Sequence, residues 1–246
     1  MRFLLTFLIS IISLNAYTIR ADYKVTFGIF GKVGEANAYF KKDKDHYLIK
    51  VEAKAKGLAK LLSKNRIETY ISEGVVKNGV LIPNFFKKIR KNSTKRIVKI
   101  YRFDHNAKKI YKTTITYKDG KRDERIEVLN YYAKNDILSL YFNLKEFLKP
   151  NITQMKLYAV GGDRKDGGVE IILPDSKEKE KLAKIFKSKD GLFLDVLLHQ
   201  KIFASKEGRL HLLIDRDGIT KKAVLKDVIF FGDIVGTLTN LSKGQL

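Results

Sequence analysis

The chain of 246 residues carries 49 Lys and Arg residues against 27 Asp and Glu residues, a formal net charge of +22, and it contains no cysteine. The absence of cysteine excludes disulfides, thiol catalysis, iron–sulfur clusters and zinc sites built on cysteine. The positive charge suits an anionic partner such as a lipid. Because the lysines are spread along the whole chain, we favour compositional bias and the protection of exposed sheet edges as its origin.

Residues 1–16 have the pattern of an export signal. Arg2 is followed by an uncharged, mostly apolar run over residues 3–14, and Ala16 is a small residue at which a signal peptidase cuts. A run of this length is too short for a comfortable membrane span. We predict cleavage after Ala16, with a cut after Ala21 as the alternative, and a periplasmic mature protein with no transmembrane segment.

Alternation of apolar and polar residues dominates the remaining chain and predicts β-strands. The strongest such segments are residues 23–27, 47–51, 97–103, 110–117, 211–214, 223–231 and 234–238. Sequences rich in Asp, Asn and Gly indicate hairpin turns, and they occur at residues 43–45, 77–79, 104–106, 118–120 and 215–218. Short strands joined by such turns favour an antiparallel sheet.

Three segments have helical character. Residues 58–62 allow one short turn, and residues 177–186 are either a helix or a charged connection. The clearest helix is predicted for residues 136–148, where Asn135 or Asp136 is the expected N-cap and Pro150 follows the end. Its apolar residues recur three and four positions apart on one face, and these are Ile137, Leu140, Tyr141, Leu144 and Leu148.

These elements predict the fold class. No fixed repeat and no Pro- or Ser-rich linker divides the chain, so we treat residues 17–246 as a single β-rich domain. The fold we expect is mainly β, a rolled or partly closed antiparallel sheet with one helix, at about residues 136–148, packed on or inside it.

Two glycine-containing motifs resemble ligand loops but depart from them. In residues 27–35 the glycines fall at relative positions one, four and seven, and Gly31-Lys32 is followed by Val33, which fits neither a dinucleotide loop nor a Walker loop. We interpret this segment as a bulge or bend. Residues 163–168 and 215–218 resemble fragments of calcium loops but lack further oxygen ligands and a closing Glu, so we interpret both as hairpin turns.

Chemistry-bearing residues are sparse, and we predict no metal site, no cofactor and no catalytic residue. The chain has four histidines, which we interpret as ordinary surface or half-buried side chains: His46, His105, His199 and His211. A metal site of His199, His211 and Asp195 across a hairpin is a minor alternative. Residues 85–91 mix aromatics with lysines, and we favour a strand with aromatics inward and lysines outward over a surface for nucleic acid or lipid head groups.

Several segments, in order, resemble the family of exported bacterial proteins called domain of unknown function 3108. They are residues 23–35, 47–62, 81–85, 136–144, 212–218 and 232–238. The chain departs from the family at Lys221-Lys222-Ala223, where relatives carry a proline, which puts the local turn in doubt. The resemblance implies a β-rich periplasmic domain with a central helix, and it implies no activity, substrate or catalytic residue.

Our leading hypothesis for function is a non-enzymatic periplasmic protein that binds a lipid or another envelope component. An apolar concave sheet face would hold an acyl chain, and the candidate ligand-binding residues are Tyr23, Phe27, Phe30, Tyr39, Tyr141 and Phe142. The competing interpretation is that these aromatics only fill the core. The alternatives are a protein-interaction module that uses a sheet edge or a lysine-rich face, and, less favoured, an envelope hydrolase. No nucleic acid partner is expected outside the cytoplasm.

Overall fold

The computed structural model describes residues 17–149, 151–162, 164–197, 208–226, 228 and 232–245. Within them, eight long strands follow one another as an antiparallel meander, because a tight turn ends each strand and apolar residues alternate along it. They are β1 (Tyr17–Phe27), β2 (Lys32–Asp43), β3 (His46–Ala55), β4 (Ile67–Lys77), β5 (Val80–Lys91), β6 (Lys95–Asp104), β7 (Lys109–Lys118) and β8 (Lys121–Val128).

The second half of the chain adds shorter strands to the same sheet. They are β9 (Asn135–Asp136), β10 (Gln154–Val160), β11 (Gly168–Ile172), β12 (Leu192–Leu197), β13 (Arg209–Ile214), β14 (Thr220–Leu225) and β15 (Ile234–Gln245). β15 pairs with β1, so the described residues form one sheet in the order β8 to β1 followed by β15 to β9. β9 and β10 are parallel, and the other neighbours are antiparallel.

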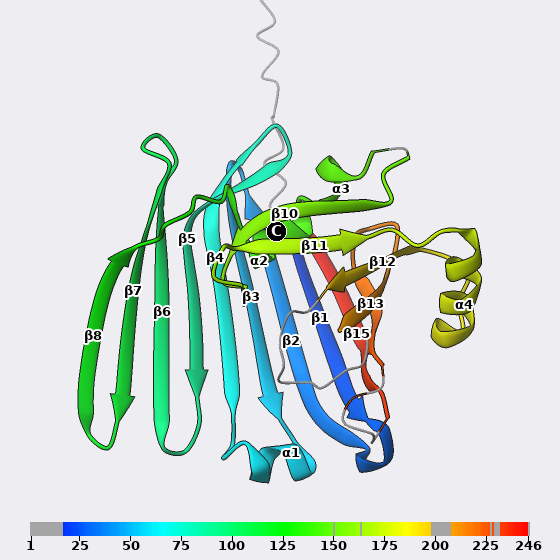
Figure 1. Cartoon of the computed structure of the whole chain (residues 1–246), viewed down its shortest axis with the longest axis horizontal. Helices are drawn as coiled ribbons and strands as arrows, with labels where there is room; N and C mark the ends of the chain where they lie inside the picture. The colour runs from blue at the N-terminus through cyan, green and yellow to red at the C-terminus, as the bar shows by residue number, and fades with distance from the viewer. Residues whose placement is uncertain are drawn as a thin grey trace, which may run out of the picture.

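The sheet rolls over itself without closing. Figure 1 shows β10 and β11 running across the direction of the long strands, and α2 (Ile137–Phe142) contacts β10 on one side and β4 and β5 on the other. Gly161, which follows β10, has a φ of 91°, and an added Cβ would lie 2.3 Å from the Phe86 ring of β5. This close approach brings the second half of the sheet over the concave face of the first.

The predicted fold class is confirmed, with corrections to individual elements. The structure is mainly β, and each of the five predicted turns joins consecutive strands. The predicted strand at 223–231 is confirmed over Ala223–Leu225, where β14 ends; Lys226 is not in a strand, and residues 227 and 229–231 lie outside the described residues. Val228 donates its backbone N–H to the Gly232 carbonyl, and Gly232, with a positive φ of 103°, lies just before β15.

The helical segment predicted for residues 136–148 forms at that place, but the structure divides it into two short helices, α2 and α3 (Leu144–Phe147). Asn143 separates them. Its buried side chain accepts a hydrogen bond from the Leu81 backbone N–H and donates to the Leu81 carbonyl, both at 2.8 Å. These two bonds hold the chain against β5 and break the helical path.

The other short elements agree with the sequence patterns. α1 (Gly57–Leu62) forms at the predicted short helical turn. Residues 177–186 belong to a helix, α4 (Ser176–Phe186), and not to an irregular charged connection, and Asp175 is the N-cap of α4. The glycine-rich segment is a bend, since η1 (Gly28–Phe30) joins β1 to β2. Among the described residues, no helix has the length and apolar character needed to cross a bilayer.

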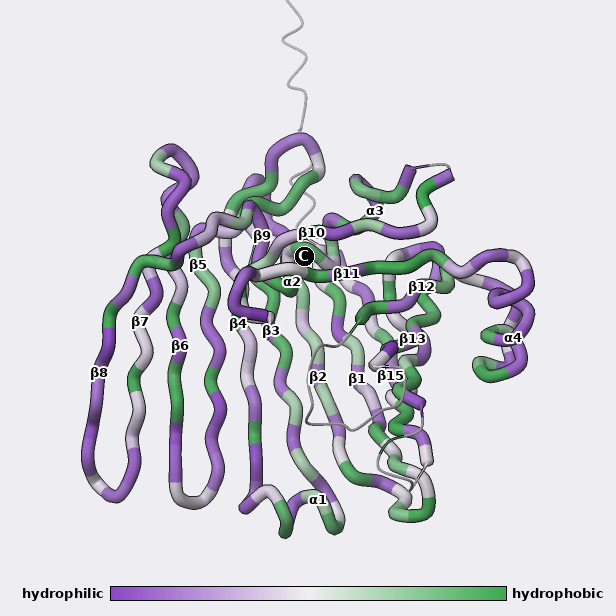
Figure 2. The backbone as a smooth tube through the Cα atoms, viewed as in Figure 1, coloured by the Kyte–Doolittle hydropathy of each residue, from purple (hydrophilic) through white to green (hydrophobic). Residues whose placement is uncertain are grey.

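The apolar core lies mainly on the concave side of the sheet. Figure 2 shows hydrophobic and hydrophilic residues alternating along the long strands. Phe86, Tyr101 and Ile110 of β5, β6 and β7 pack with Val160 of β10. On the opposite face of the second half, α4 covers a separate cluster that contains Phe193 and Leu213. The helix α2 therefore lies inside the roll, whereas α4 lies outside it.

Candidate functional site

A buried polar network fixes α2 inside the roll. Asp136, which is fully buried, caps the helix: its Oδ1 accepts hydrogen bonds from the Leu138 N–H at 2.8 Å and the Ser139 N–H at 3.0 Å. Ser139 Oγ in turn accepts from the Asp136 N–H at 3.0 Å, which completes a capping box. These bonds satisfy N–H groups that would otherwise be unpaired at the start of a buried helix.

The same aspartate ties α2 to the sheet. Ser72 of β4 donates its hydroxyl to Asp136 Oδ2 at 2.6 Å, and the Tyr47 hydroxyl of β3 lies 3.0 Å from Ser72 Oγ. Since Ser72 has one proton and gives it to Asp136, Tyr47 is the donor to Ser72. Burial raises the pKa of Asp136, against the opposing effect of its hydrogen bonds. The network therefore fixes the position of α2 relative to β3 and β4.

An apolar cavity of about 350 Å³ lies between α2 and strands β1–β3, with β14 and β15 at its side. We call it the Ala36 cavity. Its floor has short side chains where the strands pass under the helix, so the sheet and the helix do not fill the space between them. The small lining residues are Ala21, Ala36, Ala38, Ala223 and Gly236.

A second apolar cavity, of about 360 Å³, lies between α2, the β10–β11 hairpin and strands β12 and β13. We call it the Lys88 cavity. Most of its lining is aliphatic, from Leu140, Ile171, Leu194 and Leu212 among others. Lys88 of β5 and Arg164 of the β10–β11 turn are the charged residues of its lining, and no carboxylate belongs to it among the described residues.

Tyr141 of α2 lines both cavities. Its hydroxyl lies 2.7 Å from the Gly218 carbonyl, to which it donates, and 2.9 Å from Thr220 Oγ1. Burial raises the pKa of Tyr141 and so favours the neutral phenol. The tyrosine therefore presents a fixed aromatic ring to both spaces while its polar end is satisfied by the β13–β14 turn.

Four of the six predicted ligand-binding residues, Tyr23, Tyr39, Tyr141 and Phe142, belong to the lining of the Ala36 cavity. Phe142 also stacks on Phe40 at a ring-centroid distance of 4.6 Å. Burial, together with the neighbouring Tyr141, raises the pKa of Tyr23. These aromatic side chains border the cavity on the side of the helix and along β1.

The Tyr39 ring nevertheless points to the other face of the sheet, and Phe27 and Phe30 lie outside the cavity lining. The Arg20 guanidinium stands 5.4 Å from the centre of the Tyr39 ring. Arg20 and Tyr39 pair across β1 and β2, and they alternate with the concave-face residues on each strand. The Tyr39 ring thus lies on the convex face. Phe27 and Phe30 pack against each other at 5.4 Å beside the β1–β2 bend.

Sequence reasoning missed Lys88. The interpretation of residues 85–91 as aromatics inward and lysines outward is wrong for this residue, because Lys88 lies two positions after the buried Phe86 and so shares its face. Its Nζ stands 5.2 Å from the centre of the Tyr70 ring. The period of two contained the signal, but only the roll of the sheet gives this face an apolar cavity.

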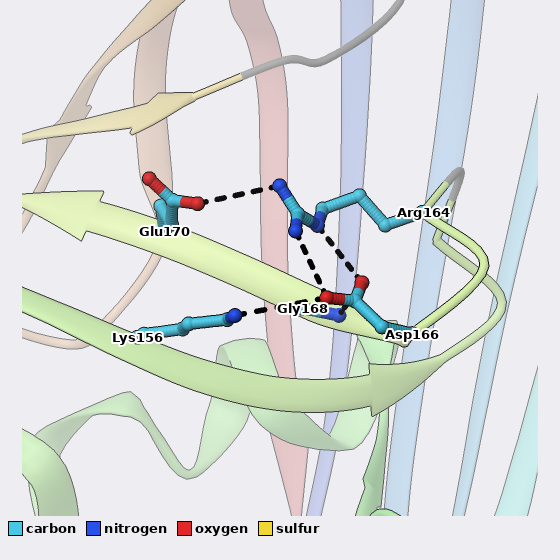
Figure 3. A network of polar contacts seen from close by, with 5 residues as sticks. All are labelled: Lys156, Arg164, Asp166, Gly168 and Glu170. Atoms are coloured by element: carbon cyan, nitrogen blue, oxygen red, sulfur yellow. Dashed lines mark hydrogen bonds and ion pairs between the residues drawn. The ribbon is translucent and has the colours of Figure 1, made fainter. Parts of the chain in front are cut away.

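Arg164 is held by acidic partners (Figure 3). Its Nε and Nη2 donate to the two carboxylate oxygens of Asp166 at 2.8 and 2.9 Å, and Nη1 reaches Glu170 at 3.4 Å. Lys156 lies 3.6 Å from Asp166, and the Gly168 N–H also donates to that carboxylate. Arg164 and these donors hold the pKa of Asp166 well below its usual range. The cluster closes the β10–β11 turn and leaves Arg164 neutralised.

Two members of the alternative metal site predicted from the sequence, His211 and Asp195, lie next to each other. His211 Nδ1 lies 2.6 Å from Asp195 Oδ1, with Arg209 3.6 Å from the other oxygen, on the face covered by α4. His199 lies outside the described residues. Within the part of the chain that the structure describes, no group of three or more histidines and carboxylates is arranged to hold a metal ion. The two interior cavities are lined mainly by apolar side chains.

The comparison with protein-family models agrees with the resemblance noted from the residues. A comparison with curated proteins finds no match. Among solved structures, the chain is similar to a β-barrel-like protein of the domain of unknown function DUF1849 from Brucella abortus, with 13% identity, 94% of this chain and 99% of that chain covered, and a TM-score of 0.49. The model of the family described as protein of unknown function (DUF3108) matches residues 22–239. The chain therefore belongs to the DUF3108 family.

Proposed function

We propose that this protein is an exported, non-enzymatic binding protein for the acyl chain of an envelope lipid, which it holds in the cavities beside α2. The main support for this proposal is the pair of apolar cavities that share Tyr141 as a lining residue. They lie beside α2, which buried hydrogen bonds hold in place. Each volume is at the lower end of the ~300–1,000 Å³ typical of small-molecule sites.

The energetics favour an apolar occupant. Side chains that border an empty space lose the contacts that a packed neighbour would supply, and apolar cavities stay dry and accept apolar ligands. Each methylene buried from water contributes about 0.8 kcal/mol. An acyl chain therefore gains binding energy along its whole length, without any specific polar contact.

The periplasmic location is part of the proposal and rests on the export pattern of residues 1–16. Cleavage after Ala16 keeps β1 whole, whereas a cut after Ala21 would remove the buried Ile19 and Ala21 together with their pairing to β2 and β15. The structure of the mature domain supports the first cleavage position.

The test is binding of palmitate and of uncharged hexadecanol to the mature protein, purified from the periplasm without detergent and examined by native mass spectrometry. We expect one lipid per chain. Ala36→Phe and Val196→Phe each fill one cavity, and we expect each to weaken binding at least about tenfold, since a bulky ring displaces several methylenes. Ala107→Phe makes the same kind of change at an exposed turn and is the matched control.

The proposal fails if the wild-type protein binds neither palmitate nor hexadecanol. It also fails if both filled variants stay folded, by their circular dichroism and thermal unfolding, and bind as well as Ala107→Phe. A loss confined to one filled variant supports the proposal and assigns the chain to that cavity.

A further inference from the structure

We infer that the ligand is an anionic amphiphile whose acid group, a carboxylate or a phosphate, lies against Lys88. This inference rests on the proposed function and names the chemistry of the ligand. It starts from the lining of the Lys88 cavity, which is apolar except for two cationic residues and contains no carboxylate among the described residues.

The two cations differ in their availability. Arg164 is clamped by Asp166 and Glu170 (Figure 3). The Nζ of Lys88 lies over the Tyr70 ring, and within the described residues no carboxylate lies within 4.0 Å of it in an ion pair. Lys88 is thus the cation of this lining whose charge is not already matched.

The nearby acid is already engaged by other groups. Glu68 of β4 accepts the Tyr70 hydroxyl on one carboxylate oxygen at 2.5 Å and Arg90 Nε on the other at 2.8 Å. Glu68 therefore cannot turn to Lys88 without breaking a charge-assisted bond to Arg90.

The neighbouring strand adds positive charge on the same side. Lys99 of β6 lies directly opposite Lys88 in the register of the sheet. Glu127 interacts with the charge of Lys99, so Lys88 is the member of this pair that an anion would meet. An anion beside Lys88 gains a charge-assisted hydrogen bond at the edge of an apolar space. Lys88 repels a positively charged amphiphile, so the site selects against cations.

The placement fits an acyl chain with an acid at one end. The aliphatic residues Leu194, Val196 and Leu212 supply the wall for the chain on β12 and β13. Lys88 of β5 and Tyr70 of β4 line the cavity from the first half of the sheet. The chain and its acid group are therefore recognised by different elements: the second half of the sheet binds the chain, and the first half binds the charge.

The experiment measures the affinities of three ligands for the wild-type protein and for three lysine variants. Affinities for palmitate, palmitoyl lysophosphatidylglycerol and hexadecanol are measured for the wild-type protein and for Lys88→Gln, Lys88→Arg and Lys87→Gln. Lys87 precedes Lys88 but faces the other side of the sheet, so Lys87→Gln removes the same charge without touching the cavity.

We expect Lys88→Gln to weaken binding of at least one of the two anionic probes about tenfold to a hundredfold, the range expected for a lost hydrogen bond to a charged group. Hexadecanol binding stays within about twofold, Lys88→Arg retains most of the affinity, and Lys87→Gln behaves as wild type. The anionic probe that responds more strongly identifies the acid as carboxylate or phosphate.

The outcomes separate the two proposals. Wild-type protein that binds hexadecanol as tightly as both anionic probes, with no selective loss in Lys88→Gln, overturns the role of Lys88 and leaves acyl-chain binding intact. Wild-type protein that binds none of the three probes defeats acyl-chain binding itself. A loss in Lys87→Gln equal to that in Lys88→Gln would also overturn the inference, because net charge alone would then account for it.

Discussion

Asp136 and Asp195 are both fully buried, but the structure compensates their charges in different ways. Around Asp136 the partners are neutral dipoles: one hydroxyl and two backbone N–H groups occupy both carboxylate oxygens. Around Asp195 the partners are basic side chains, with His211 at 2.6 Å and Arg209 at 3.6 Å, and Oδ2 has no hydrogen-bond partner among the described residues.

The difference follows from where each aspartate lies. Asp136 begins a helix inside the roll, so the unpaired N–H groups of the first turn are already aimed at it. Asp195 lies in the middle of β12, where the backbone N–H groups are used by the sheet, and only side chains from the next strand can reach it. The start of the helix therefore supplies hydrogen bonds to both carboxyl oxygens of Asp136, whereas one oxygen of Asp195 has no hydrogen-bond partner among the described residues.

The largest effect is expected from Asp136→Ala. Alanine removes the helix cap and leaves the buried Ser72 hydroxyl without its acceptor, so we expect a loss of about 3 kcal/mol in the free energy of unfolding, measured in urea. Asp175→Ala removes the exposed cap of α4, and we expect a loss of about 1 kcal/mol there. Equal losses at the two caps would mean that the interior network adds nothing to a surface cap.

A smaller effect is expected from Asp195→Asn. Asparagine keeps an oxygen for His211 and loses the attraction to Arg209, a side chain that is about a third exposed. We expect a loss of about 1 kcal/mol or less in the free energy of unfolding, with the exposed Asp190→Asn as the control. A loss above about 3 kcal/mol would contradict the ranking of the two aspartates, because it is typical of breaking a well-compensated buried ion pair.

The smallest chemical change is Asp136→Asn, for which we predict the direction in which the relative stability changes with pH. Because burial raises the pKa of Asp136, the folded protein keeps that proton to a higher pH than the unfolded chain does. The stability contributed by this group is fully present below its unfolded pKa, about 4, and is lost as the pH rises through the folded pKa. The stability of the wild-type protein relative to Asp136→Asn should therefore fall as the pH increases above about 4.

Urea unfolding of both proteins across this pH range measures the difference directly. Asp175→Asn, changed at the exposed cap of α4, is the control for a general effect of replacing an aspartate cap. A wild-type protein that gains stability relative to Asp136→Asn as the pH rises would show that hydrogen bonding outweighs burial in setting the pKa of Asp136. The difference between the surroundings of Asp136 and those of Asp195 would then be larger than described above.

Much of the fold is local and could be read from the sequence. Ile49 and Val51 alternate with Lys50 and Glu52, and the turn at residues 77–79 has the residues that a hairpin requires. These signals depend on the period of a strand and on the conformational freedom of turn residues. The break at Asn143 could not be predicted, because it depends on hydrogen bonds to Leu81, which is 62 positions earlier in the chain.

The candidate site divides in the same way. The sequence predicted Tyr23, Tyr39, Tyr141 and Phe142 as lining residues from their aromatic character, and these four do belong to the lining of one cavity. It could not show that the Tyr39 ring points to the other face, since the side of the sheet depends on register, and a shift of one position exchanges the two faces. Lys88 was assigned to the outside for the same reason.

What the sequence determined by itself was the list of strands, their turns and the mainly β class, since neighbouring residues decide these through backbone preference and periodicity. What only the tertiary structure decided was the interior of the roll. Gly161 allows the second half of the sheet to approach Phe86, and Asp136 fixes α2 against Ser72. The two cavities and the exposure of Lys88 to one of them follow from those contacts, because a cavity is a property of surfaces that meet from distant parts of the chain.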